Sequence, residues 1–155
     1  MFRVSCIFLI LIGIPSLAQS SFTHKGSGMR FTLPEGWTYT DQGNFFEASD
    51  PAQEVYLLFF EGKSQEAEAS IEGALSDLGK LIKVPEITTE PTKSENNGLN
   101  ITFLEGEGLT VNKEVIAWDL TCVQGTAKTM VIIAMGEIAS NQKAVDGIYQ
   151  SIHEQ

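Results

Sequence analysis

Three neighbouring stretches in the C-terminal half of the chain, 98–104, 114–123 and 127–135, are rich in β-branched and aromatic residues. Gly- and Asn-bearing turns separate them, a pattern typical of an antiparallel meander. In the second and third stretches, apolar side chains occupy both alternating faces, which indicates strands that are covered on both sides. We therefore expect the meander to form the buried centre of a sheet.

Shorter strand patterns precede the meander, separated by turn signals such as Pro34-Glu35-Gly36 and Asp50-Pro51. They predict a set of short hairpins over residues 29–33, 37–40, 45–48 and 55–60. The polar, small residues of 19–28 predict a loose arm in which His24 is solvated. Residues 87–95 contain Pro91, so an edge strand or an irregular connection is expected there.

Helical spacing of apolar residues occurs twice, over 64–82 and over 141–153. Ser64 and Ser140 are the predicted N-caps of these helices. Asn97-Gly98 predicts a type I′ hairpin turn, because both residues tolerate positive φ angles. The element order is hairpins, helix, meander, helix. This order predicts an α+β fold in which an antiparallel sheet is sandwiched between helices.

The first eighteen residues have the pattern of a secretory signal peptide. A short positive region is followed by an apolar core from Cys6 to Ile14 and by the small residues Ser16 and Ala18. The alternative is an uncleaved membrane anchor, but this apolar stretch is short for a bilayer core of about 30 Å. We expect cleavage after Ala18, no stable membrane span afterwards, and a periplasmic or extracellular location.

The composition is acidic, with 20 Asp and Glu against 10 Lys and Arg and a formal net charge of −10. Such a surface repels phosphate groups, which argues against binding to nucleic acid or to anionic membranes. Cys6 leaves with the leader, so Cys122 is alone and no intrachain disulfide is possible. A lone Cys in an apolar strand is expected to be a small buried hydrophobe.

Catalytic chemistry has little support in the sequence. The two His residues, His24 and His153, lie near the chain ends, and no Cys/His zinc spacing is present. The glycines of Glu105-Gly106-Glu107-Gly108 flank carboxylates, which repel phosphate. We therefore expect a protein that is not an enzyme, has no catalytic residues and needs no cofactor.

Acidic residues offer one possible metal site. Glu105 and Glu107 share a face if their stretch is a strand, and Glu114 can approach from the return strand. Hard cations such as Ca²⁺ prefer several oxygen ligands, so these three are candidates for a weak metal site, the alternative being a solvated strand end. Asp119 is an acid within an apolar strand, for which we expect a position at the sheet margin or a pair with Lys128 or Lys113.

Aromatic residues of the early hairpins are the candidates for partner binding, namely Trp37, Tyr39 and Phe46. Any of them left exposed would form an apolar patch suited to a protein or peptide. The alternative is that they pack in the core.

The element order, together with Phe31-Thr-Leu-Pro-Glu-Gly-Trp37 and Ile148-Tyr-Gln-Ser-Ile152, resembles the PsbP-like superfamily. That superfamily includes extrinsic proteins of photosystem II, a nuclear Ran-binding relative and small exported bacterial proteins. The resemblance spans residues 22–153 as one domain and implies a non-enzymatic interaction module with an antiparallel sheet between helices. No residue here carries over photosystem or Ran binding.

These observations predict an exported interaction module, monomeric or weakly dimeric, that binds a protein partner in the cell envelope. The alternative function is that of a periplasmic protein binding a small ligand or a divalent metal.

Overall fold

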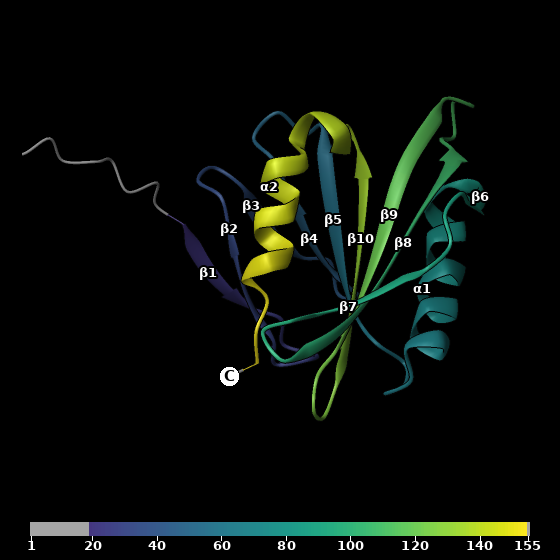
Figure 1. Cartoon of the computed structure of the whole chain (residues 1–155). Helices are drawn as coiled ribbons and strands as arrows, with labels where there is room; N and C mark the ends of the chain where they lie inside the picture. Colours follow the sequence, from purple (N-terminus) through teal and green to yellow (C-terminus); the bar gives the residue numbers. More distant parts are fainter. Residues whose placement is uncertain (1–18, 155) are drawn as a thin grey trace, which may run out of the picture.

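The computed structural model describes residues 19–154, so the predicted signal peptide, 1–18, lies outside the described residues. Along this part of the chain the elements are β1 Ser20–Thr23, β2 Arg30–Leu33, β3 Thr38–Asp41, β4 Phe46–Ser49, β5 Val55–Glu61, α1 Ala67–Leu81, β6 Lys83–Ile87, β7 Thr92–Asn96, β8 Leu99–Leu109, β9 Val115–Gln124, β10 Thr129–Gly136 and α2 Ile138–Ser151. Figure 1 shows their arrangement.

A large sheet of eight strands forms the centre of the molecule, in the order β3-β4-β5-β10-β9-β8-β6. Its strand pairs are antiparallel, and β7 pairs with β8 on the same edge as β6. The predicted α+β class is therefore confirmed. β8, β9 and β10 form the expected meander, and Asn97 and Gly98, both with positive φ, make the turn between β7 and β8.

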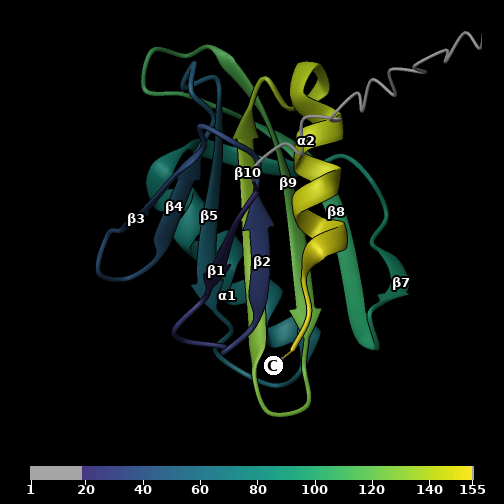
Figure 2. The same ribbon diagram turned by 90° about the vertical axis from the view of Figure 1, so that its left-hand side faces the viewer.

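Different elements cover the two faces of this sheet (Figures 1 and 2). α1 packs on one face, where Ala74 and Leu78 meet the side chains of Trp118 and Leu120. On the other face, α2 and the separate hairpin of β1 and β2 together enclose a second apolar cluster. Each fully buried large side chain in these clusters contributes about 1.5–3 kcal/mol to stability.

The alternation of β9 divides its side chains between the two clusters. Trp118, Leu120 and Cys122 face α1, whereas Val123 faces the opposite cluster. The predicted burial of Cys122 is confirmed, and burial raises the pKa of its thiol to about 12. Asp119 is also buried and lies on the α2 side of the sheet, where the site described below is found.

Gly106 allows the indole of Trp118 to lie across β8. The two residues are register partners, and a Cβ at position 106 would lie 2.1 Å from the Trp118 ring and 2.2 Å from the Glu86 carbonyl oxygen. Atoms cannot approach so closely, so the sheet requires glycine at this position. The glycine predicted to be irrelevant to phosphate binding therefore has a packing role.

The predicted helix caps are wrong. α1 begins after Glu66, and the hydroxyl of Ser64 accepts a hydrogen bond from the Glu66 N–H at 3.0 Å, in a turn that precedes the helix. α2 begins at Ile138 after Glu137, which places Ser140 inside its first turn. Neither helix has a side-chain hydrogen bond from its N-cap residue.

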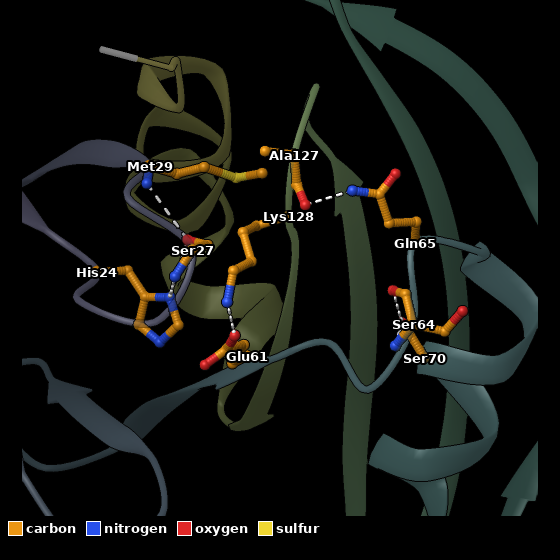
Figure 3. A network of polar contacts seen from close by, with 9 residues as sticks. All are labelled: His24, Ser27, Met29, Glu61, Ser64, Gln65, Ser70, Ala127 and Lys128. Carbon is orange, nitrogen blue, oxygen red and sulfur yellow. Dashed lines mark hydrogen bonds and ion pairs between the residues drawn. The ribbon is translucent and has the colours of Figure 1, made fainter.

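The predicted loose arm is also wrong, because residues 20–23 pair with β2. His24 is 2% exposed, and its ring packs edge-on against Phe46 at 5.4 Å between centroids. Figure 3 shows the local contacts of this region: the Ser27 hydroxyl lies 2.9 Å from His24 Nδ1, and Lys128 pairs with Glu61. Burial lowers the pKa of His24, and the nearby charge of Glu61 partly opposes this effect.

Candidate functional site

The three aromatic residues predicted to bind a partner lie at the margin of the apolar cluster under α2. Trp37, Tyr39 and Phe46 are partly buried and pack against that cluster. The rings of Tyr39 and Phe46 stack at 5.2 Å, and Tyr39 also contacts Phe31 at 5.4 Å between ring centroids. Packing accounts for the positions of these side chains, and their role in binding stays a prediction.

The acidic candidates lie on β8 and in the turn that follows it. Glu105 and Glu107 are exposed on the α2 side of the sheet, and Glu114 is exposed just before β9. Within residues 19–154, no three Asp, Glu, His or Cys side chains are placed to hold a metal ion. Glu105 and Glu107 instead line a hollow beside α2.

That hollow begins with a pocket of about 530 Å³ between the C-terminal half of α2 and strands β7, β8 and β9. Its lining combines apolar, neutral polar and acidic side chains, which are Thr92, Ser94, Asn96, Ile101, Phe103, Glu105, Thr121, Gln142, Asp146, Tyr149, Gln150 and Ile152. The volume lies in the range of ordinary ligand sites, which is about 300–1,000 Å³.

Two further hollows continue the pocket towards the start of α2. The next one shares Glu105 and Gln142 with the pocket and also contains Asp119. The third shares Glu107 and Ile138 with the second and reaches the first residues of the helix. The three hollows adjoin one another along the helix, and we call this row of hollows the α2 groove, defined by the residues that line them.

A buried acid lies at the floor of the α2 groove. Asp119 is 4% exposed and accepts a hydrogen bond of 2.6 Å from the Tyr149 hydroxyl. Burial raises the pKa of Asp119 to about 7; the Tyr149 hydrogen bond opposes this shift, and the charges of Glu105 and Asp146 add to it. Burial, together with the charge of Asp119, raises the pKa of Tyr149 well above its usual value.

The lysine pair predicted for Asp119 is wrong, because its partner is Tyr149 of α2. Lys128 instead pairs with Glu61. The sequence marks Asp119 as unusual, but nothing local links it to a tyrosine 30 residues away. Only the docking of α2 on the sheet brings the two side chains together.

The turn between β7 and β8 holds the C-terminal end of α2. The Asn96 side-chain amide donates to the Tyr149 and Gln150 carbonyl oxygens at 3.1 and 3.3 Å. The Asn97 amide donates to the carbonyl oxygens of Gln150 and Ile152 at 3.1 and 2.8 Å. Terminal helix carbonyls lack partners within the helix, so these amides satisfy them and fix one wall of the pocket.

Comparison by sequence gives no match to any family model or curated protein. Solved structures do match. The solution structure of cyanobacterial PsbP (CyanoP) from Synechocystis sp. PCC 6803 matches with a TM-score of 0.64 and 14% identity, over 98% of each chain. The chain has a PsbP-like fold.

Two crystal structures share this PsbP-like fold more distantly. LpqN, involved in cell envelope biogenesis of Mycobacterium tuberculosis, has a TM-score of 0.55 and 12% identity, over 87% of this chain and 89% of its own. PA94 of Pseudomonas aeruginosa, a protein of unknown function and putative regulator, has a TM-score of 0.55 and 13% identity, over 88% of this chain and 97% of its own. Similarity at such identities extends to the fold alone. Within residues 19–154, no helix is long and apolar enough to cross a membrane.

Proposed function

We propose that the protein is an exported, non-catalytic interaction module that binds a protein partner in the cell envelope through the α2 groove. The observation that carries this proposal is the groove itself, a row of adjoining hollows that follows α2 from its first residues to its last turn. An elongated row of hollows suits a chain segment of a partner. The envelope role of LpqN, which has the same fold, supports the cellular setting.

The Asp119–Tyr149 pair is a structural element of this proposal. Asp119 of β9 is 4% exposed and accepts the hydrogen bond of Tyr149 from α2. In this module the pair fixes α2 against the sheet and gives the groove a rigid floor.

Photo-crosslinking from within the groove tests the proposal. Benzoylphenylalanine replaces Gln142, which lines the groove, and in a control protein it replaces Glu72, which is exposed on α1 at the opposite face. Irradiation of cells should give a defined protein adduct from position 142 that position 72 does not give. Asp146→Lys in the groove should abolish the adduct. Equal adducts from both positions, or none from position 142, would contradict the proposal.

Trp37, Tyr39 and Phe46 are the competing candidate for the docking surface, and the same crosslinking experiment tests them. Trp37→Ala leaves the groove lining intact, because Trp37 packs against the apolar cluster on the β1–β3 side. If Trp37→Ala removes the adduct while the variant keeps its circular dichroism spectrum, the partner contacts the aromatic surface as first predicted.

The alternative function is binding of a small organic ligand in the 530 Å³ pocket. Its mixture of apolar and polar lining is typical of such sites. Native mass spectrometry of protein purified from its own envelope would reveal a co-purifying small molecule. A stoichiometric adduct that Phe103→Ala removes would favour this alternative over a protein partner.

A further inference from the structure

The α2 groove has the length of a short extended peptide. α2 contains 14 residues, so at about 1.5 Å per residue it spans roughly 21 Å. An extended chain advances about 3.3 Å per residue, and about six residues would therefore follow the groove from end to end.

The charges that line the groove all have one sign. Carboxylates occur in each of its three hollows, and they are Glu54, Glu105, Glu107, Glu114, Asp119, Glu137 and Asp146. No Lys, Arg or His lines any of these hollows. The ion pairs of Lys25, Lys63, Lys80, Lys93 and Lys128 involve other acids, namely Asp41, Glu61, Glu68 and Asp77.

Two neighbouring acids in the groove face each other across strands. Glu105 of β8 is the register partner of Asp119 of β9, and like charges directly opposite each other destabilise a sheet. The protein thus retains a repulsive pair at the centre of the groove. A bound cation would remove this repulsion.

Two buried polar side chains, Thr121 in the pocket and Asp119 in the adjoining hollow, have unused hydrogen-bonding capacity. The Thr121 side chain is 2% exposed and lines the pocket. Its hydroxyl lies close enough to Tyr149 for an interaction that partly opposes the rise in the Tyr149 pKa, but within residues 19–154 it has no hydrogen bond of ordinary length and angle. Asp119 accepts one hydrogen bond, although a carboxylate has about four acceptor positions. Buried polar groups are ordinarily satisfied, so both side chains point to a ligand that donates hydrogen bonds.

We propose, building on the function proposed above, that the groove binds an extended basic segment of the partner, with one lysine or arginine side chain entering the pocket towards Asp119 and Thr121. Such a side chain has an apolar stem that fits against Ile101 and Phe103 and a charged end that only donates hydrogen bonds. The other basic residues of the segment lie along the carboxylates of the groove.

This binding mode predicts that the affinity for the basic segment depends on pH, because binding is linked to the protonation of Asp119. The titratable groups that line the pocket and the adjoining hollow are Glu105 and Glu107 on β8, Asp119 on β9, and Asp146 and Tyr149 on α2. A cation beside Asp119 favours its ionised form, so binding releases a proton where free Asp119 is partly protonated, near pH 7. Affinity should therefore rise at least threefold from pH 6 to pH 8, and Asp119→Asn should remove this rise.

A labelled nonapeptide of alternating arginine and leucine, added to the mature protein and followed by fluorescence anisotropy, tests the proposal. Glu105→Gln combined with Asp146→Asn should weaken binding at least tenfold at low salt. The control, Glu35→Gln combined with Glu72→Gln, removes the same charge at exposed positions outside the groove and should weaken it less than twofold. Equal weakening by both pairs, or no binding of the basic peptide, would overturn the proposal.

A competition experiment separates this inference from the function on which it rests. The basic peptide should suppress the partner adduct formed from position 142, whereas a matched peptide of alternating glutamate and leucine should not. If the adduct forms but the basic peptide does not suppress it, the partner is real and its basic character is refuted. If no adduct forms, the proposed function itself fails.

Discussion

At the scale of single residues, Asp119 combines a structural role with an energetic cost. It anchors α2 through Tyr149, but its carboxyl lies in an apolar sheet beside two other acids. The folded protein therefore disfavours the ionised form. Since the unfolded chain has no such preference, ionisation of Asp119 lowers the free energy of unfolding as the pH rises from about 4 to about 7.

Asp119→Asn should consequently stabilise the protein at pH 8 by up to about 4 kcal/mol and leave its stability nearly unchanged at pH 4. The amide oxygen can still accept the Tyr149 hydrogen bond. Urea unfolding of the wild type and the variant at both pH values measures the effect. Glu72→Gln, on the exposed face of α1, controls for net charge. The prediction would be contradicted if the free energies of unfolding of the wild type and Asp119→Asn differed by the same amount at pH 4 and at pH 8.

Asp119 also shows how far sequence analysis of the site extends. An acid within the apolar run of β9 is visible in the sequence, so its unusual character could be predicted. Tyr149 could not be linked to it, because periodicity places that residue on the inner face of a helix without saying which strand it meets. The pocket arises from that same packing, and its lining comes from β7, β8, β9 and α2 together with Ile152, which follows α2.

At the scale of elements, the interiors of helices and strands could be predicted and their ends could not. The apolar spacing that defines α1 and α2 is repeated over many residues, whereas a cap depends on one side chain. The Ser64 hydroxyl accepts a hydrogen bond from the Glu66 N–H in the turn before α1. Serine is a favourable N-cap residue and lies near the start of the helix, but it does not cap α1. The Asn97-Gly98 turn could be predicted because positive φ angles restrict the residue types strongly.

The contact of Gly106 with Trp118 makes a prediction about β8. Gly106→Ala should destabilise the protein by about 1–3 kcal/mol, because the added methyl group collides with the indole and with the backbone of β6. Gly147→Ala is a matched control within α2, where a Cβ meets no atom within 4 Å, and it should stabilise by up to about 1 kcal/mol. Thermal unfolding of both variants measures the difference, and a loss of stability in both would contradict this account.

At the scale of the whole molecule, the two faces of the sheet are covered by different kinds of layer. The sequence predicts short strands near the N-terminus, but a strand pattern does not specify the sheet to which a strand belongs. β1 and β2 form a hairpin of their own, which shares with α2 the covering of one apolar cluster. Phe22 and Phe31 of this hairpin join the aromatic contacts of Tyr39. His24, which follows β1 directly, is buried and packs against Phe46.

The buried position of Cys122 makes the rate of thiol labelling a measure of how often the protein opens. It is the only cysteine in the described residues, is 0% exposed and has a pKa near 12. A thiol reagent can reach its sulfur only after α1 has left the sheet or β9 has separated from its neighbours. If both require unfolding of the whole domain, labelling at neutral pH occurs at the frequency of global opening. The labelling rate should fall as the stability rises. Gly147→Ala should therefore be labelled more slowly than the wild type, and Gly106→Ala should be labelled faster. Rapid labelling of the native protein would show that α1 or β9 opens locally. If labelling of Cys122 is slow, a cysteine introduced on the surface can be modified selectively.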